Sequence, residues 1–152
     1  MMVWLRHAAS LRVVIAGANA DLRRRLRESL EVNPGVVVCA EASDGPAALR
    51  IALEERPDAC LVTDEPGFDS VGVVDALVEH APHVSVMLSG EDPDDDTLMR
   101  AVASGAAGYV TSGTDGAKLA AAVFDAVSGQ PAFPERLATL LIARLREEPR
   151  VA

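Results

Sequence analysis

Five short apolar runs alternate along the chain with segments whose apolar residues recur every three to four positions. The first run, 11–16, is followed by Leu22, Leu26 and Leu30, which share one helical face. Short apolar runs bounded by turn residues are typical of buried strands, so the pattern predicts strands that alternate with amphipathic helices. The predicted strands are residues 11–16, 36–40, a third that begins at Ala59, 84–88 and 109–110.

Turn and capping residues mark the ends of the predicted helices. Ser43-Asp44-Gly45-Pro46 begins the second helix, with a capping side chain ahead of a proline in the first turn. Asn33-Pro34-Gly35 ends the first helix, Pro82 the third and Gly129 the fifth. Every predicted strand is therefore followed by one helix.

This alternation predicts an α/β fold, a parallel sheet with right-handed crossovers and helices on both faces. We expect a doubly wound, five-stranded sheet in the flavodoxin-like order 2-1-3-4-5. In this order the first strand separates Cys39 from Cys60, and two strand spacings of together about 9.6 Å exceed disulfide reach. Both cysteines are predicted to be free and to pack as small apolar residues.

The chain divides into an N-terminal arm (1–10), one domain (11–129) and a linker or association helix (130–152). The last segment changes character after Gly129, with a sixth helix predicted from about Pro134 to Pro149. Its apolar stripe consists of Leu137, Leu140, Leu141 and Leu145.

Composition and charge narrow the class of protein. The 152 residues are 49% apolar and 24% charged, which is ordinary for a globular domain. A net charge of −9 argues against nucleic-acid binding by this chain itself. No apolar run is long enough to span a bilayer, and residues 1–5 are too short for a signal-peptide core. We therefore expect a cytoplasmic protein without membrane contact.

Several patterns that suggest ligand sites are incomplete. Gly17 follows a strand and precedes a helix, as in a dinucleotide fingerprint, but Asn19 and Leu22 replace the second and third glycines. Residues 92–96 alternate as in a calcium loop, but they lack its glycine and its closing glutamate, so a helix start rich in acids is the better interpretation. Four arginines of the first helix are interpreted mostly as a solvated face: Arg23, Arg24, Arg25 and Arg27.

Six short segments spread over residues 11–130 carry a family resemblance. They are Leu11-Arg12-Val13-Val14-Ile15-Ala16, Ala42-Ser43-Asp44-Gly45-Pro46-Ala47-Ala48-Leu49, Arg56-Pro57-Asp58, Pro66-Gly67-Phe68-Asp69, residues 101–109 and Gly129-Gln130-Pro131. Each is weak alone, but together the chain resembles the receiver domain of bacterial response regulators, in particular the NarL/FixJ type.

The resemblance implies a phosphoryl switch. Such domains carry an acidic pair after the first strand that binds Mg²⁺, and an aspartate at the end of the third strand that accepts the phosphoryl group. A serine or threonine after the fourth strand and a lysine after the fifth contact that group. Mg²⁺ requires oxygen ligands, and the transferred group requires positive charge around its oxygens.

This sequence departs from the family at most of these positions. Gly17 and Ala18 stand in place of the acidic pair, Thr63 in place of the acceptor and Ser112 in place of the lysine. Asp64 could accept the group only if the strand slipped by one residue, and such a slip turns side chains to the other face.

Two positions keep the family's residue type. Ser89 follows the fourth strand, and Tyr109 is an aromatic residue that often serves as a rotameric switch in the family. The sequence thus predicts the scaffold of a receiver around a degenerate phosphorylation crevice.

From this we expect an atypical receiver that is not an enzyme, holds no metal or cofactor, and does not depend on phosphorylation. It would act by protein contact, as a homodimer or a heterodimer with another regulator, and control a helix-turn-helix transcription domain outside this chain.

Two alternatives stay open. One is a small ligand in the former crevice, and the other is a flavodoxin-like nucleotide or flavin binder. The crevice would be bounded by Gly17, Ala18, Thr63, Asp64, Ser89 and Ser112.

Overall fold

Strands and helices alternate in the predicted order in the computed structural model, which describes residues 10–147. The strands are β1 (Leu11–Ala16), β2 (Val36–Ala42), β3 (Ala59–Thr63), β4 (Ser85–Gly90) and β5 (Gly108–Thr111). The helices are α2 (Ala20–Glu31), α3 (Gly45–Glu55), α4 (Ser70–His80), α5 (Asp95–Ala103), α6 (Gly116–Val127) and α7 (Arg136–Glu147). Almost all of the predicted arm, and the end of the sixth helix at Pro149, lie outside the described residues.

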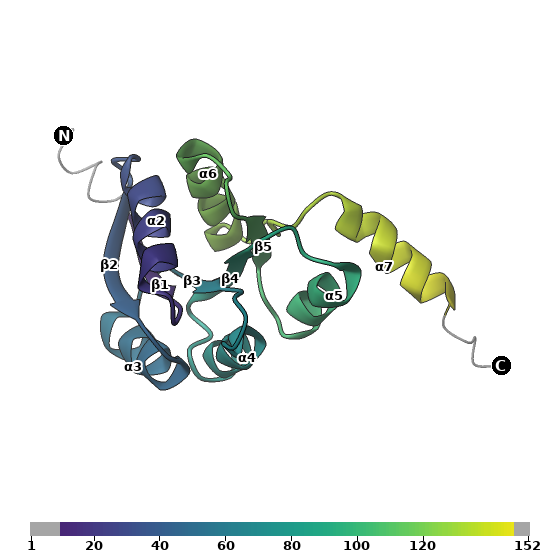
Figure 1. Ribbon diagram of the computed structural model, residues 1–152, viewed down its shortest axis with the longest axis horizontal. Coiled ribbons are helices and arrows are strands. Elements are labelled where there is room, and N and C mark those ends of the chain that lie inside the picture. The colour runs from purple at the N-terminus through teal and green to yellow at the C-terminus, as the bar shows by residue number, and fades with distance from the viewer. Residues whose placement is uncertain (1–9, 148–152) are drawn as a thin grey trace.

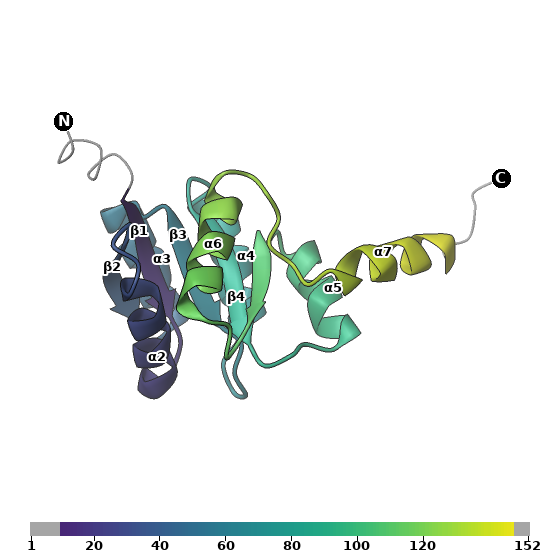
Figure 2. The same cartoon turned by 90° about the horizontal axis from the view of Figure 1, so that it is seen from above.

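The sheet has the predicted order β2-β1-β3-β4-β5, and every neighbouring pair is parallel. Helices α2 and α6 cover one face, and α3, α4 and α5 cover the other (Figures 1 and 2). Successive residues of one strand serve opposite faces, so Leu61 packs toward α2 and α6 while Val62 packs toward the other layer. The predicted fold class is confirmed.

Asparagine or aspartate caps begin the five helices that follow a strand. Each cap side chain accepts a hydrogen bond from a backbone N–H of the first helical turn, which would otherwise be unsatisfied. These caps fix the loops at the carboxyl edge of the sheet, where ligand sites of such folds lie. The caps are Asn19, Asp44, Asp69, Asp94 and Asp115.

The two cysteines are free, as the strand order predicts. Cys60 on β3 is fully buried, and this burial raises the pKa of its thiol to about 12. Cys39 on β2 is partly exposed, and its Sγ lies 3.6 Å from the carbonyl oxygen of Val13. Both thiols therefore stay protonated at neutral pH and pack as apolar groups.

The chain returns to the sheet after α6. Ala132 forms an isolated parallel bridge with Gly108 at the outer edge of β5. The N–H of Ala132 donates to Ala107 at 2.9 Å, and the N–H of Tyr109 donates to Ala132 at 2.9 Å. A side chain at Gly108 would collide with this backbone, since an added Cβ would lie 2.5 Å from the Ala132 carbonyl oxygen. The packed structure therefore continues past Gly129.

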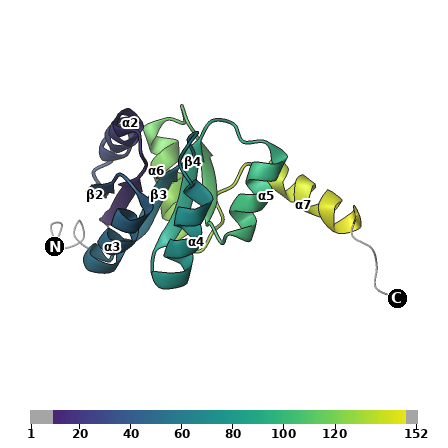
Figure 3. The same ribbon diagram turned by 60° about the horizontal axis from the view of Figure 1, so that its bottom comes forward.

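Helix α7 begins at Arg136, slightly later than expected, and packs beside α5 at the end of the molecule opposite β2 (Figures 1 and 3). Leu137 is buried in the core, while Ile142 and Leu145 on later turns are exposed. The Nη1 of Arg136 lies 2.9 Å from the carboxylate of Asp92, and a second ion pair joins α7 to α5. Within residues 10–147, no helix combines the length and apolar character needed to cross a bilayer.

Candidate functional site

The predicted crevice residues meet at the carboxyl edge of the sheet. Thr63 and Ser89 are direct partners in the β3–β4 register, and the N–H of Ser112 donates to the carbonyl of Gly90 at 2.5 Å. Thr63, Asp64, Ser89 and Ser112 all line one open groove of about 1150 Å³. Its lining residues do not include Gly17, which is buried against Thr63, or Ala18, which is exposed on the loop between β1 and α2.

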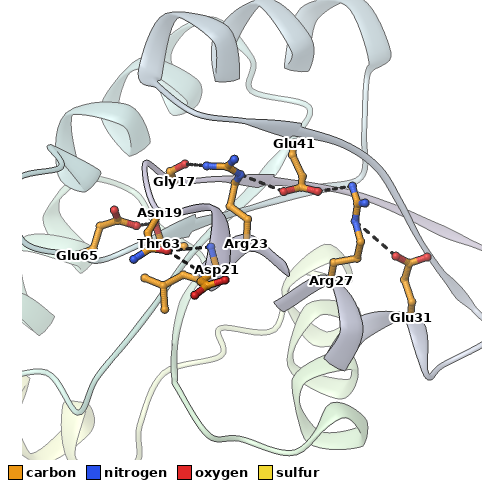
Figure 4. A network of polar contacts seen from close by, with 10 residues as sticks. Gly17, Asn19, Asp21, Arg23, Arg27, Glu31, Glu41, Thr63 and Glu65 are labelled. Carbon is orange, nitrogen blue, oxygen red and sulfur yellow. Dashed lines mark hydrogen bonds and ion pairs between the residues drawn. The ribbon is translucent and has the colours of Figure 1, made fainter. Parts of the chain in front are cut away.

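Gly17 and Thr63 are sterically interlocked. A Cβ added to Gly17 would lie 2.0 Å from Oγ1 of Thr63 and 2.9 Å from its Cγ2. Thr63 is only 2% exposed, and its Oγ1 donates a hydrogen bond of 2.5 Å to Oε2 of Glu65 (Figure 4). The threonine side chain therefore occupies the space that any side chain at position 17 would need.

An arginine of α2 holds the loop that carries Gly17. The Nη1 of Arg23 donates to the Gly17 carbonyl oxygen at 2.5 Å, and its Nε donates to Glu41 on β2 at 3.0 Å (Figure 4). Glu41 also pairs with Arg27, whose Nε lies 3.6 Å from Glu31 (Figure 4). The Arg23 side chain is 16% exposed, so its interpretation as part of a solvated face was wrong. Helical spacing could not reveal that an acid on β2 lies within its reach.

Asp64 points to the other side of the sheet edge and holds Tyr109. The tyrosine O–H donates to Oδ2 of Asp64 at 2.8 Å and lies 3.0 Å from the carbonyl oxygen of Glu91. Ser70 donates to Oδ1 of Asp64 at 3.3 Å. Tyr109 is 3% exposed, and this burial, together with the Asp64 carboxylate, raises the pKa of its phenol well above the ordinary value. The phenol therefore remains a protonated donor.

The comparison with known families identifies the fold. The family model described as the response regulator receiver domain matches residues 13–124. The chain belongs to this family. Among curated relatives, the receiver is 27% identical over 137 residues to the transcriptional regulatory protein LiaR of Bacillus subtilis, covering 90% of this chain and 65% of LiaR. It is 28% identical over 137 residues to the DNA-binding transcriptional activator DevR/DosR of Mycobacterium tuberculosis, covering 90% and 63%. The receiver thus spans a little under two thirds of the length of these relatives.

Solved structures of response regulators are also similar to this chain. The signal receiver domain of the putative response regulator NarL from Mycobacterium tuberculosis matches with a TM-score of 0.73 and 27% identity, covering 80% of this receiver and 98% of that chain. A LuxR-family two-component response regulator from Aurantimonas sp. SI85-9A1 matches with a TM-score of 0.78 and 26% identity, covering 91% and 99%.

The residues of this receiver do not fit a Mg²⁺ ion. Mg²⁺ takes oxygen ligands in octahedral geometry, including one or two carboxylates. Gly17 and Ala18 supply no side-chain oxygen, and the Gly17 carbonyl faces the guanidinium of Arg23, which repels a cation. Among residues 10–147, no three histidine, cysteine or acidic side chains are grouped so that they could hold a metal.

Sequence reasoning missed two residues that position the tyrosine of this receiver. Ser70 begins α4 and is buried beside Asp64. Gly90 leaves room for the phenol, since an added Cβ would lie 2.5 Å from the Tyr109 hydroxyl oxygen. A serine after a capping aspartate and a glycine after a strand both suggest ordinary loop residues, so the sequence carried no distinct signal for either.

Proposed function

We propose that this receiver domain signals without being phosphorylated and acts through contacts with other proteins. The interlock of Gly17 and Thr63 is the observation that carries the proposal. Thr63 stands at the acceptor position, and its side chain fills the space of a metal-binding acid at position 17. A phosphoryl group transferred there would lack both a carboxylate acceptor and the cations that neutralise its oxygens.

The contacts of Asp64 support the same proposal. Its carboxylate accepts hydrogen bonds from Tyr109 and Ser70, which reduce its availability as a nucleophile. It also lies on the side of α4 and α5, whereas Ser89, the retained hydroxyl, alternates with Leu88 and faces the α2–α6 layer with Met87. At the lysine position Ser112 offers no positive charge. We infer that the domain is not an enzyme and takes no Mg²⁺.

The curated relatives are the basis for proposing which process this receiver domain controls. LiaR and DevR/DosR are described as a transcriptional regulatory protein and a DNA-binding transcriptional activator. We propose that this domain likewise controls a transcription-regulating helix-turn-helix domain in the cytoplasm, as a homodimer or a heterodimer with another regulator. Since the net charge is −9, the receiver itself is not expected to bind nucleic acid.

Light scattering of the purified chain tests this proposal. We expect the same molar mass, whether monomer or dimer, with and without acetyl phosphate and Mg²⁺. The proposal leaves the chain without the acidic pair, acceptor and lysine through which phosphorylation would change its association. A receiver with the full acidic pair, acceptor and lysine serves as the control that the donor is active. A change of molar mass that requires both donor and Mg²⁺ would overturn the proposal.

A further inference from the structure

The groove at the carboxyl edge of the sheet has the composition of a small-molecule site. It lies between α2, α6 and the loops that follow β3, β4 and β5, and its volume is about 1150 Å³. Leu22 and Leu26 of α2 and Leu119 of α6 contribute apolar side chains, and hydroxyls of β3, β4 and the loop after β5 contribute polar atoms. Ligand sites commonly combine apolar walls with a few polar groups in this way.

One hydroxyl that lines this groove has no hydrogen-bond partner among the described residues. Ser89 is 5% exposed, and its Oγ makes no hydrogen bond with any residue that the structure describes. Its register neighbour Thr63, which is equally buried, donates to Glu65. The Ser89 oxygen is open to the groove rather than sealed in the core, so it can accept a hydrogen bond from a bound group.

The charge around the groove selects the kind of ligand. Six acidic residues line it against one basic residue, Arg25, so a phosphate or carboxylate would meet net repulsion. Four of the six acids are already engaged: Asp64 by Tyr109, Glu65 by Thr63, Asp92 by Arg136 and Asp94 by the N–H of Thr97. The carboxylate of Glu91 has no hydrogen-bond or ion-pair partner in the described part of the chain, and it stands two residues from Ser89.

We propose that this groove binds a small organic cation, a primary amine with an apolar body. The ammonium group would donate to the Ser89 hydroxyl and pair with the acidic side chains that line the groove, among them Glu91. The apolar body would lie along the leucines of α2 and α6. The inference goes beyond phosphorylation-independent signalling and does not require it, since binding is measured without a phosphoryl donor.

Three probes with the same phenylethyl body separate the possible ligand classes: 2-phenylethylamine, 2-phenylethanol and 3-phenylpropionate. Amide chemical shifts of the full chain in ¹H–¹⁵N NMR report binding. We expect saturable shifts at Ser89 and its neighbours with the amine, with a dissociation constant of about 1 mM, which is within reach of so small a ligand. The alcohol and the carboxylate should bind at least about fivefold more weakly.

Two substitutions test the named contacts. Ser89→Ala should weaken amine binding about fivefold through the loss of one hydrogen bond. Glu91→Gln should weaken it severalfold at low salt and reduce its dependence on ionic strength. Ser85→Ala, at the opposite end of β4, removes the hydrogen bond of Ser85 to Ala126 and should leave the affinity unchanged. Absence of saturable shifts at Ser89 at about 20 mM amine, or equal binding of the alcohol or the carboxylate, overturns the proposal.

Discussion

Replacing Gly17 with alanine is expected to lower the free energy of unfolding by about 3 kcal/mol, as overpacking of a filled site does. The added Cβ would lie 2.0 Å from Oγ1 of Thr63, whose side chain is buried and cannot swing into solvent. Gly17 is not among the glycines with a positive φ, so alanine introduces no backbone strain there. Urea unfolding monitored by circular dichroism measures the change.

The double variant, Gly17→Ala with Thr63→Ala, separates the steric collision between the two residues from other effects at position 17. Thr63→Ala removes both of the atoms that the new Cβ would strike at less than 3.0 Å. In that background Gly17→Ala should cost less than about 1 kcal/mol, a coupling of roughly 2 kcal/mol between two residues in contact. An equal cost of Gly17→Ala in both backgrounds would show that the two side-chain positions do not compete for one space.

Tyr109 is expected to stay un-ionised in the folded protein at a pH where an exposed tyrosine has lost its proton. Burial raises its folded-state pKa, and the hydrogen bond to Asp64 and that residue's negative charge raise it further. The resulting stability is fully present below the unfolded pKa of about 10 and is lost at up to about 1.4 kcal/mol per pH unit above it. Because the chain has one tyrosine, phenolate absorbance reports Tyr109 alone, and it should rise only as circular dichroism shows unfolding.

Asp64→Asn tests how much of the rise in the pKa of Tyr109 is caused by the Asp64 carboxylate. Without the negative charge, phenolate should appear at a lower pH than in the unaltered protein, but still above the ordinary pKa because the ring remains buried. Asp75→Asn removes an exposed charge of α4 and should leave the titration unchanged. An ordinary pKa in the folded protein, or identical titrations for Asp64→Asn and the unaltered chain, would contradict the contact between Asp64 and Tyr109.

The strand order could be predicted because it depends on features that extend over many residues. Five apolar runs separated by capped helices leave few arrangements of a parallel sheet, and the segments that resemble receivers favour one of them. The free cysteines followed from the same order, since β1 lies between their strands.

Contacts of single side chains could not be predicted in this way. The sequence identified Gly17 and Thr63 as departures from the family, but their collision depends on distances of a few ångströms across β1 and β3. It left open whether Asp64 would replace the acceptor, and the structure directs that carboxylate to Tyr109. The bridge between Ala132 and Gly108 involves one residue pair, which is too short to produce a periodic pattern.

Intact-mass spectrometry after incubation with acetyl phosphate and Mg²⁺ shows whether this receiver can be phosphorylated. A receiver with the complete set of acidic and lysine residues, treated in the same way, shows that the reaction conditions are sufficient. Because we propose that Thr63 stands in place of the acceptor, and Gly17 and Ala18 in place of the metal-binding acids, we predict an unchanged mass for this chain at every donor concentration. A phosphoryl adduct that forms only with Mg²⁺ and disappears in Asp64→Asn would show that this receiver is phosphorylated on Asp64, contrary to the proposed phosphorylation-independent signalling.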